Sequence, residues 1–452
     1  MPLSPISRKR REDGELQLLE EFDHTRMNNS ESKARAFSTV KVLLTDTNRW
    51  ALSARLAMSL SEAGCQVSAL CPKPGHALSK TRAVHRTFHY SGLRPLESLS
   101  AAIDEVEPDL IVPSCDRGTG HLHELYAKAQ KNEAAESKVA ALIERSLGQP
   151  ASYCTVSSRH DLLALAREES VRVPNTGRIN TPEELEAWRA RESFPWVLKA
   201  DGTWGGGGVR IVHTAEDVQQ YRAQLARMFR PARALKRLIL NRDSFWLRPW
   251  WNNSRPAVVA QSYISGRPAN CAVVCWKGTI LAGFGVEVLS SEGSTGPASI
   301  VRVVDNPDMM FAAERISSRL GLSGFFGLDF MIEDGTGDTY LIEMNPRVTP
   351  LCHLRLGKGR DMPGALWAQV TGQRSPEARP ATENEVIAYF PEARDSHLLA
   401  SSFYDVPQGE PELVDELLQP WPNRTLLFRL FNCLSAKKSP AAVAGNQASL
   451  RL

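Results

Sequence analysis

The chain has 452 residues, too many for one ordinary hydrophobic core, so we expect two or three domains. Hydrophobic residues make up 42% and charged residues 23%, as in a soluble globular protein, and the net charge of +3 is too small to indicate a nucleic-acid partner. No run of about 18 apolar residues occurs, which excludes a membrane-spanning helix. The 8 cysteines are scattered and the N-terminus lacks a secretory signal, so we expect a cytoplasmic, reducing location.

Both ends of the chain are polar and aperiodic. Residues 1–38 and 436–452 are therefore predicted to be disordered tails. The basic run at positions 8–11 would suit a targeting signal or a nucleic-acid patch, but short basic runs are common, so a solvated tail is the favoured interpretation.

The region 39–148 alternates between short apolar runs and segments with helical periodicity. We expect strands at 40–44, 66–70 and 109–113 and helices at 51–63 and 96–106. Strands that alternate with helices form parallel sheets with right-handed crossovers, so this region is predicted to be a Rossmann-like α/β domain. It has no GxGxxG motif and does not indicate a dinucleotide site.

The region 149–375 has a different, α+β pattern. A helix is expected at 159–168, and Thr181 with Glu184 forms a capping box that begins another. Residues 196–199 and 209–212 predict a β-hairpin around a glycine-rich loop. Further strands are expected at 258–264, 272–276 and 280–288, and as a pair within 320–346 around the turn at 333–337.

Two stretches carry no motif. The segment 228–256 has seven basic residues, three tryptophans and one acid, which suits a membrane or nucleic-acid surface; an amphipathic elaboration of the fold is favoured. Residues 376–435 are predicted only to form a C-terminal α/β segment.

The first chemical motif is the glycine loop. Gly205, Gly206, Gly207 and Gly208 have no Cβ atoms, so their backbone can approach a polyphosphate closely and direct N–H groups toward it. Lys199 ends the preceding strand and supplies a positive charge. Because glycine-rich hairpins are also common as plain turns, the loop alone is not specific.

The second motif places two carboxylates near each other. Asp329 and Glu343 lie on the two strands joined by the turn, and antiparallel pairing would bring them side by side. A divalent cation would remove the repulsion between them, and Asn345 adds an oxygen on the same strand face as Glu343. Oxygen ligands of this kind suit Mg²⁺ shared with phosphates. Arg347 can then hold a phosphate oxygen.

Taken together and in order, these segments resemble the ATP-grasp superfamily. The pattern consists of Lys199 followed by the glycines, the segment Gln261-Ser262-Tyr263-Ile264, Asp329-Phe330, and the specific run Glu343-Met344-Asn345-Pro346-Arg347. It covers roughly residues 149–375, and the preceding region resembles a pre-grasp domain. The similarity is greatest to carbamoyl-phosphate synthetase, biotin carboxylase and the carboxylate–amine ligases.

The resemblance implies a role for each matching residue. Arg159 and Lys199 would hold ATP phosphates under the glycine loop, and adenine would be read by Gln261, the Ser262 carbonyl and the Ile264 amide. Asp329, Glu343 and Asn345 would bind Mg²⁺ or Mn²⁺, with Arg347 facing the transferred phosphoryl group. Residues 294–299 fall where family members keep a substrate loop. Many members have an acid near position 270, where this chain has Asn270.

The implied function is an ADP-forming ligase that activates a small-molecule carboxylate as an acyl phosphate for attack by an amine. A bicarbonate-activating enzyme, a phosphotransferase and a non-catalytic nucleotide-binding protein are the alternatives. Small-molecule substrates are expected as partners, without nucleic acid, and a homodimer is possible because dimers are the commonest oligomers. The identity of the two substrates cannot be predicted, since substrate pockets are built from variable loops.

Overall fold

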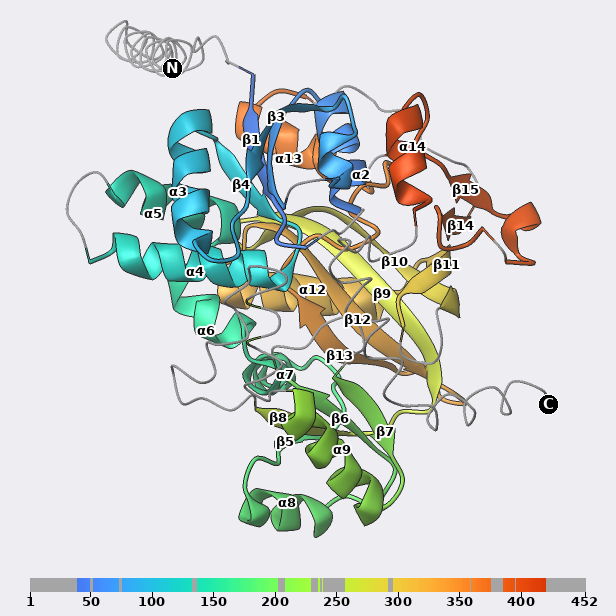
Figure 1. The fold of residues 1–452 in the computed structure, drawn as a ribbon. Helices are drawn as coiled ribbons and strands as arrows, with labels where there is room; N and C mark the ends of the chain where they lie inside the picture. The colour runs from blue at the N-terminus through green and yellow to red at the C-terminus, as the bar shows by residue number, and fades with distance from the viewer. Residues whose placement is uncertain are drawn as a thin grey trace, which may run out of the picture. The chain divides into compact units, whose positions relative to one another are not determined.

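The first part of the fold in the computed structural model is a parallel sheet of short apolar strands (Figure 1). Its order is β3-β2-β1-β4, and its strands are β1 (Lys41–Thr45), β2 (Gln66–Cys71), β3 (Val84–His89) and β4 (Leu110–Pro113). The helices of this part are α2 (Leu52–Glu62), α3 (Pro95–Val106), α4 (Asp116–Ala129) and α5 (Glu136–Leu147), with the 3-10 turn η1 (Ala77–Ser79). The predicted parallel, Rossmann-like arrangement is confirmed.

The structure describes a defined set of residues: 39–48, 52–72, 75–131, 136–201, 208–228, 235, 238, 257–291, 296–357, 359–374, 385–394 and 396–419. From Val40 onward they form one compact unit. The predicted tails, most of the basic segment 228–256, and Gly205, Gly206 and Gly207 lie outside the described residues. The predicted domain boundaries stay a prediction.

A small antiparallel sheet follows, with the order β5-β8-β6-β7. Its strands are β5 (Thr176–Arg178), β6 (Trp196–Ala200), β7 (Val209–Val212) and β8 (Val258–Ser262), and its helices are α8 (Pro182–Arg189) and α9 (Ala215–Met228). The predicted hairpin is confirmed by the antiparallel pairing of Lys199 with Val209, and the predicted capping box of Thr181 and Glu184 is also confirmed. Trp188 and Trp196 pack edge to face in the core of this lobe.

Three short helical segments lie between these parts. They are η2 (Pro150–Ser152), α6 (Tyr153–Val156) and α7 (Arg159–Glu168). The helix α7 begins where predicted because the Ser158 side chain accepts a hydrogen bond from the Asp161 amide and caps it.

The largest sheet has seven strands in the order β13-β12-β9-β10-β11-β14-β15. They are β9 (Gly266–Trp276), β10 (Thr279–Ser291), β11 (Ala298–Val304), β12 (Gly324–Glu333), β13 (Thr339–Asn345), β14 (Val386–Tyr389) and β15 (Phe403–Asp405). The helices α12 (Pro307–Leu320) and α13 (Met362–Thr371) pack on it, and η4 (Leu399–Ser401) and α14 (Pro411–Leu417) follow. The region that gave no motif, 376–435, therefore supplies two strands to this sheet.

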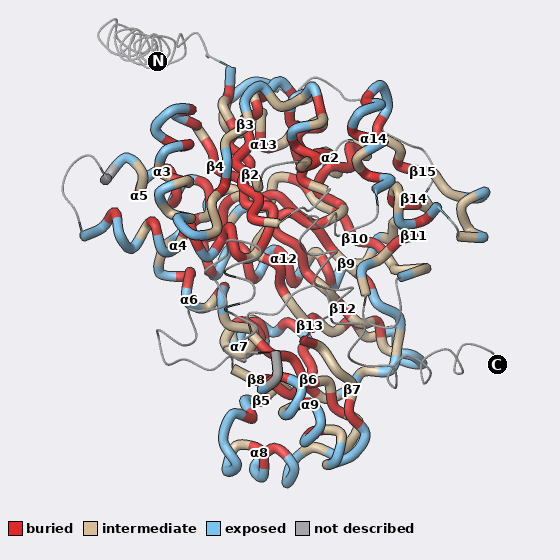
Figure 2. The backbone as a smooth tube through the Cα atoms, viewed as in Figure 1, coloured by how far each residue is buried: buried red, intermediate tan, exposed pale blue. Residues whose placement is uncertain are grey.

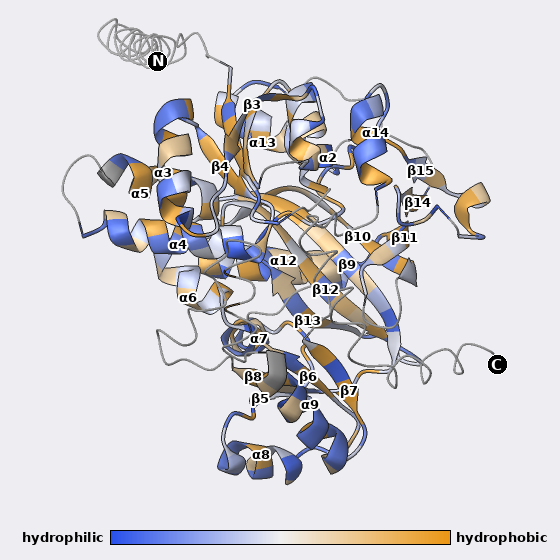
Figure 3. Cartoon of the chain, in the orientation of Figure 1, coloured by the Kyte–Doolittle hydropathy of each residue, from blue (hydrophilic) through white to orange (hydrophobic). Residues whose placement is uncertain are grey.

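Alternate residues of β9 face the two sides of the sheet. Cys271 and Cys275 belong to the cluster that includes α12, whereas Ala272 and Val274 belong to the cluster that includes α13. The central strands are buried over their middle residues (Figure 2). These strands carry mostly hydrophobic residues, in contrast to the outer helix α8 (Figure 3). A strand buried on both faces needs apolar residues at consecutive positions.

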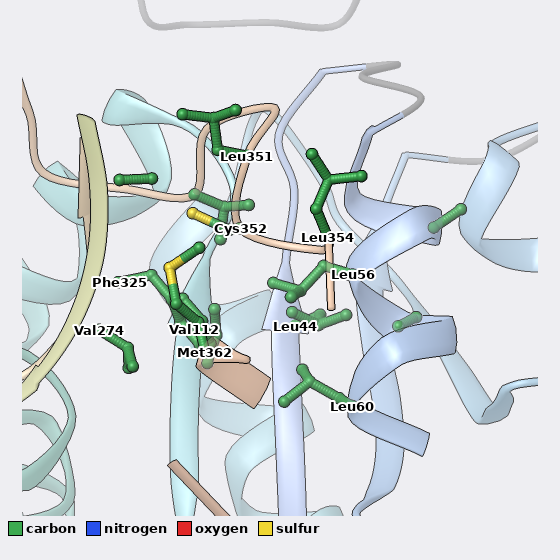
Figure 4. Packing of buried hydrophobic residues seen from close by; sticks show 14 of the residues in the cluster. Leu44, Leu56, Leu60, Val112, Val274, Phe325, Leu351, Cys352, Leu354 and Met362 are labelled. Atoms are coloured by element: carbon green, nitrogen blue, oxygen red, sulfur yellow. The ribbon is translucent and has the colours of Figure 1, made fainter. Parts of the chain in front are cut away.

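The parallel sheet and the seven-stranded sheet share one hydrophobic core. Leu44 of β1 and Leu56 of α2 meet Val274 of β9 and Phe325 of β12 in this cluster, and the loop residue Leu351 joins them (Figure 4). The shared core fixes the N-terminal part against the central sheet. Residues that lie at the edges of both sheets are therefore held in a constant relation to each other.

Candidate active site

One cavity of about 370 Å³ is lined by residues of the four-stranded antiparallel sheet, of the seven-stranded sheet and of the N-terminal part. Every sequence-predicted site residue that the structure describes lines it: Arg159, Lys199, Gly208, Gln261, Ser262, Ile264, Asp329, Glu343, Asn345 and Arg347. Gly296 of the expected substrate loop lies there too. The sequence thus selected residues from six separate segments that fold into one place.

The two predicted carboxylates face each other across a strand pair. Asp329 of β12 pairs with Glu343 of β13, and Gly327 pairs with Asn345, so the predicted antiparallel register is confirmed. The register shifts directly after this pair, where Phe330 stands opposite Leu341. Ile342 is the extra residue of this bulge, and its carbonyl oxygen accepts hydrogen bonds from two side chains of the small lobe.

Those two side chains come from neighbouring strands. Lys199 Nζ of β6 lies 2.9 Å from the Ile342 oxygen, and Gln261 Nε2 of β8 lies 3.2 Å from it. Both side chains are buried, with Lys199 3% and Gln261 2% exposed. A single carbonyl therefore orients a charged and a neutral polar group at the junction of the two sheets.

Glu343 is the anionic centre of this junction. Its Oε1 accepts hydrogen bonds from Arg159 Nε at 3.1 Å and Nη2 at 2.9 Å, and its Oε2 lies 3.6 Å from Lys199 Nζ. Burial opposes ionisation, but the charges of Lys199 and Arg159 outweigh it and hold the pKa of Glu343 below its usual value. Glu343 is therefore ionised at neutral pH.

Arg159 connects α7 to the end of β6. Besides Glu343, it donates from Nη1 to the Ala200 carbonyl and to Asp201 Oδ1, both at 3.1 Å. Burial raises the pKa of Asp201, and the nearby Arg159 charge works against that rise. The guanidinium is thus placed at the point where the glycine loop leaves β6.

Asp329 has a different environment from Glu343. Its Oδ1 accepts a hydrogen bond from Asn270 Nδ2 at 2.7 Å and its Oδ2 accepts one from Asn345 Nδ2 at 3.0 Å. Burial, and then the charge of Glu343, raise the pKa of Asp329. Asn270 therefore contributes an amide donor that supports the carboxylate.

Apolar side chains line the cavity on the side of the small lobe. Val197 and Ile211 lie on its strands, and Met331 and Ile342 lie opposite on β12 and β13. The predicted segment Gln261-Ser262-Tyr263-Ile264 passes beside them. The sequence did not single out these four apolar residues, because Val197, Ile211 and Met331 are ordinary alternating strand positions and nothing in the sequence marks Ile342 as the bulge residue. These apolar residues line a part of the cavity, here called the slot, and an apolar lining beside this polar segment suits a flat aromatic ring.

The other end of the cavity contains an ion pair between two parts of the fold. Arg347 Nε lies 3.0 Å from Asp116 Oδ2, Nη2 donates to Asn345 Oδ1 at 3.0 Å, and Nη1 donates to the Val348 carbonyl at 3.0 Å. The Asp116 charge raises the pKa of Arg347 against the effect of burial. Sequence reasoning did not identify Asp116, because nothing in its local sequence distinguishes it from other acids at a helix start.

The C-terminal strands support the same end. Tyr389 of β14 lines the cavity, next to the loop that carries Thr349 and Leu351. Behind that loop, His353 Nε2 lies 2.7 Å from Asp405 Oδ2, and Asp405 also pairs with Arg55 of α2. A buried ion-pair network therefore joins the N-terminal part, the loop and the last strand.

The donor set fits a hard divalent cation that shares its coordination with another ligand. Within the described residues no group of three His, Cys, Asp or Glu side chains could hold a metal by itself. Asp329 and Glu343 supply two carboxylates and Asn345 an amide oxygen, all lining the cavity. Mg²⁺ typically takes one or two carboxylates and completes its shell with phosphates and water.

Comparison with known proteins identifies a family match and the fold. Residues 243–350 match the ATP-grasp domain family. The chain is similar to the biotin carboxylase domain of Hydrogenobacter thermophilus 2-oxoglutarate carboxylase, solved with MgADP and bicarbonate, at 17% identity and a TM-score of 0.53 over 75% of this chain and 71% of that one. No curated protein sequence matches the chain, and no described helix is long and apolar enough to cross a membrane.

Two further solved structures are N5-carboxyaminoimidazole ribonucleotide synthetases. One, an ADP complex, shares 14% identity and a TM-score of 0.54 over 76% of this chain and 79% of that chain. The other, from Thermus thermophilus, shares 15% identity and a TM-score of 0.52 over 75% and 81%. At these identities the likeness establishes the fold, which is that of ATP-grasp enzymes, and the predicted fold class is confirmed. The match to the ATP-grasp domain family lies within the region 149–375 that carries the predicted resemblance.

Proposed function

Because the chain contains an ATP-grasp domain and has the fold of ATP-grasp enzymes, we propose that it is a Mg·ATP-dependent, ADP-forming ligase that joins a carboxylate to an amine. The observation that carries the proposal is the convergence of Lys199, Arg159, Glu343 and Asp329 in one cavity beside an apolar slot. A scaffold protein would not need buried cations and paired carboxylates at the same point, because each buried charge is costly to keep.

The proposed binding mode assigns the slot to adenine and the cations to phosphates. Gln261, the Ser262 carbonyl and the Ile264 amide would read the base. Lys199 and Arg159 would hold phosphate oxygens, under a lid that includes Gly208 and the glycines before it. Glu343 partly neutralises both cations in the free protein, so an arriving phosphate would replace a carboxylate that is already their partner.

Asp329, Glu343 and Asn345 would hold Mg²⁺, or Mn²⁺ in its place. When bound, such an ion neutralises charge that builds up on the β- and γ-phosphate oxygens during phosphoryl transfer. The hydrogen bonds from Asn270 and Asn345 keep the Asp329 carboxylate oriented toward the cavity. Burial and the charge of Glu343 raise the pKa of Asp329, and a bound cation would act against both effects.

The proposed chemistry has two steps. A carboxylate oxygen attacks the γ-phosphorus, the bond to the β-phosphate bridging oxygen breaks, and ADP leaves. An amine then attacks the carbonyl carbon of the acyl phosphate, phosphate leaves, and the amine loses a proton to give an amide. Arg347, which lines the same cavity, would stabilise the transferred phosphoryl group with its guanidinium. Closure of the small lobe would keep water from the acyl phosphate.

Bicarbonate is a second candidate for the carboxylate substrate. The biotin carboxylase domain that shares this fold was solved with bicarbonate and MgADP. Bicarbonate-dependent ADP release in the absence of any other acid would favour this candidate.

The experiment that tests the proposal is to incubate the protein with Mg·ATP and panels of acids and amines, and to separate the nucleotides by chromatography. We expect ADP and phosphate in an acid-dependent reaction. AMP with pyrophosphate as the main product would contradict the acyl-phosphate route, and ATP binding without turnover on any acid would favour a non-catalytic role.

A further inference from the structure

In the proposed binding of Mg·ATP, one charged side chain that lines the cavity has no assigned role. The cavity is lined by three cations, Arg159, Lys199 and Arg347, and three acids. Two of the acids are assigned to the metal. The third, Asp116, stands at the opposite end from the adenine slot, and its side chain is 40% exposed. It is therefore accessible to a small molecule that enters this end.

Asp116 is fixed opposite Arg347 by backbone contacts between the two parts of the fold. The Val348 amide donates to the Pro113 carbonyl at 3.2 Å, and Thr119 Oγ1 donates to the Pro346 carbonyl at 2.8 Å. These two bonds bracket Arg347 on one chain segment and Asp116 on the other. These backbone contacts hold the carboxylate and the guanidinium facing each other. The shared hydrophobic core also holds the two parts of the fold together at this junction.

The ion pair limits which carboxylic acid can bind without a penalty. Arg347 is mostly buried, with a side chain 13% exposed, and in the free protein it uses Asp116 as its anionic partner. A plain carboxylate that took over Arg347 would leave Asp116 without its cation. A molecule that carries a carboxylate and an ammonium group together would give each of the two charges a new partner, so no charge is left unpaired.

We infer that the carboxylate substrate is an α-amino acid, whose carboxylate meets Arg347 and whose ammonium group meets Asp116. This inference rests on the proposed ligase function. In an α-amino acid the two charged groups sit on one carbon, and Arg347 Nε and Asp116 Oδ2 are 3.0 Å apart, so both groups are within reach at once. Asp116 is then a specificity-determining residue for the acid.

The surroundings of the pair favour an uncharged amino-acid side chain. Val288, Pro297 and Leu351 form apolar parts of the wall, and Thr349 and Ser291 add hydroxyl groups. The other charged side chains among the described lining residues are Arg159, Lys199, Asp329 and Glu343, which are already assigned to phosphate and metal. A charged side chain would therefore lack a partner of opposite sign there.

The test uses hydroxylamine in place of the unidentified amine. The amino-acid carboxylate takes the γ-phosphoryl group and releases ADP; hydroxylamine then attacks the carbonyl carbon, expels phosphate, loses a proton and leaves a hydroxamate. L-amino acids with uncharged side chains are compared with acids that have the same side chain and no amino group, such as L-leucine with 4-methylpentanoate. We expect kcat/KM for the amino acid to exceed that for its analogue at least about 10-fold.

The variant Asp116→Asn sharpens the test because it keeps an oxygen acceptor for Arg347 and removes only the charge. We expect it to lower kcat/KM for the amino acid about 10- to 100-fold and for the desamino acid less than about 3-fold, with unchanged affinity for Mg·ATP. The control is Asp308→Asn, which changes another acid in the first turn of a helix, paired with Arg172 and absent from the cavity wall. It should leave both reactions as they are.

Three results would overturn the inference: equal use of the amino acid and its analogue, no hydroxamate from any amino acid, or an Asp116→Asn enzyme with wild-type preference. Calorimetric titration of Mg·ATP keeps this failure separate from failure of the proposed function. Intact Mg·ATP binding with hydroxamate from another acid removes only the amino-acid assignment, whereas absent nucleotide binding removes the ligase proposal itself. If Asp116→Asn melts early, Asp116→Glu, which keeps the charge, must restore the preference.

Discussion

The two ends of the cavity are built in different ways. At the nucleotide end, Lys199, Gln261 and Glu343 project from strands near the junction of the two antiparallel sheets, and the Ile342 carbonyl binds two of them. At the other end, Asp116 starts a helix of the N-terminal part, and Tyr389 comes from a C-terminal strand. One end depends on neighbouring strands, and the other depends on how distant parts of the chain pack.

This difference indicates which end of the cavity tolerates substitution. At the proposed nucleotide end Glu343 pairs with both Arg159 and Lys199, so a change there would disturb the contacts that position the two cations proposed to bind phosphate. The substrate end is joined through Asp116 and through the buried Arg55–Asp405–His353 network. Substitutions there can alter the acid that is accepted while the phosphate site keeps its geometry.

The largest expected effect is on the support of the substrate end. Asp405→Ala would remove the anion that pairs with the buried Arg55 and His353. Removal of one partner from a buried ion pair costs about 3–5 kcal/mol. We expect the free energy of unfolding to fall by this amount in denaturant titrations. The exposed Asp415→Ala in the nearby helix α14 is the matched control and should cost less than about 0.5 kcal/mol. Equal stability of the two variants would show that the C-terminal strands do not support this end.

The second prediction concerns catalysis at the nucleotide end. Glu343→Gln keeps the side-chain shape and removes the charge that faces Lys199, Arg159 and the proposed metal. We expect turnover to fall at least about 100-fold, as for the loss of one electrostatic stabiliser, with a smaller loss of ATP affinity. Activity titrated with Mg²⁺ or Mn²⁺ measures this. Near-normal turnover and metal dependence in the variant would exclude Glu343 from the metal site.

The nucleotide end was predictable because its residues follow local rules. Glu343 and Asn345 alternate on one strand, and a tight turn fixes the register that brings Asp329 opposite Glu343. The hairpin that carries Lys199 is likewise a local structure. Such patterns are short in sequence and are set by pairing geometry, so one chain suffices to recognise them.

The substrate end and one strand were not predictable in the same way. Asp116 and Tyr389 are separated by most of the chain, and only tertiary packing places them on one cavity. The strand β9 begins at Gly266, six residues before the predicted start at 272. The sequence did not predict these first residues as a strand, because Arg267, Pro268 and Asn270 give no apolar signal. Gly266 fits there because a Cβ atom would lie 2.0 Å from the Ile332 oxygen of the adjacent strand.

A third prediction tests whether Lys199 binds phosphate or only joins the sheets. Lys199→Met keeps the buried aliphatic stem and removes the charge, so ATP affinity should fall about 10- to 100-fold, or about 1.5–3 kcal/mol. The expected change appears in calorimetric titration of Mg·ATP. Arg210→Met on the adjacent strand β7 is a control, since Arg210 pairs with Gln224 outside the cavity wall. Wild-type ATP affinity with a much lower melting temperature would make Lys199 a structural residue.

The smallest expected effect is a change in protein stability with pH. His123 of α4, the helix that begins with Asp116, stacks on Tyr153 of α6 with ring centroids 4.0 Å apart, and burial lowers the pKa of His123 to about 4. A histidine in the unfolded chain titrates near pH 6.5. Between about pH 6.5 and 4 the unfolded chain therefore binds a proton that the folded chain does not bind. This group should leave stability unchanged above that window and reduce it as the pH falls through it.

Because His123 is only partly buried, we expect the loss across this window to be about 1–2 kcal/mol rather than the full value of the shift. His123→Phe keeps an aromatic ring on Tyr153 and cannot titrate, so its melting temperature should fall less than that of the wild type between pH 7 and pH 4.5. The same substitution at His85, an exposed residue of β3, should leave the wild-type acid sensitivity in place. If His123→Phe loses as much stability in acid as the wild type, this contact does not respond to pH. If it is protected, the contact between α4 and α6 weakens in acid for a reason independent of the carboxylates in the cavity.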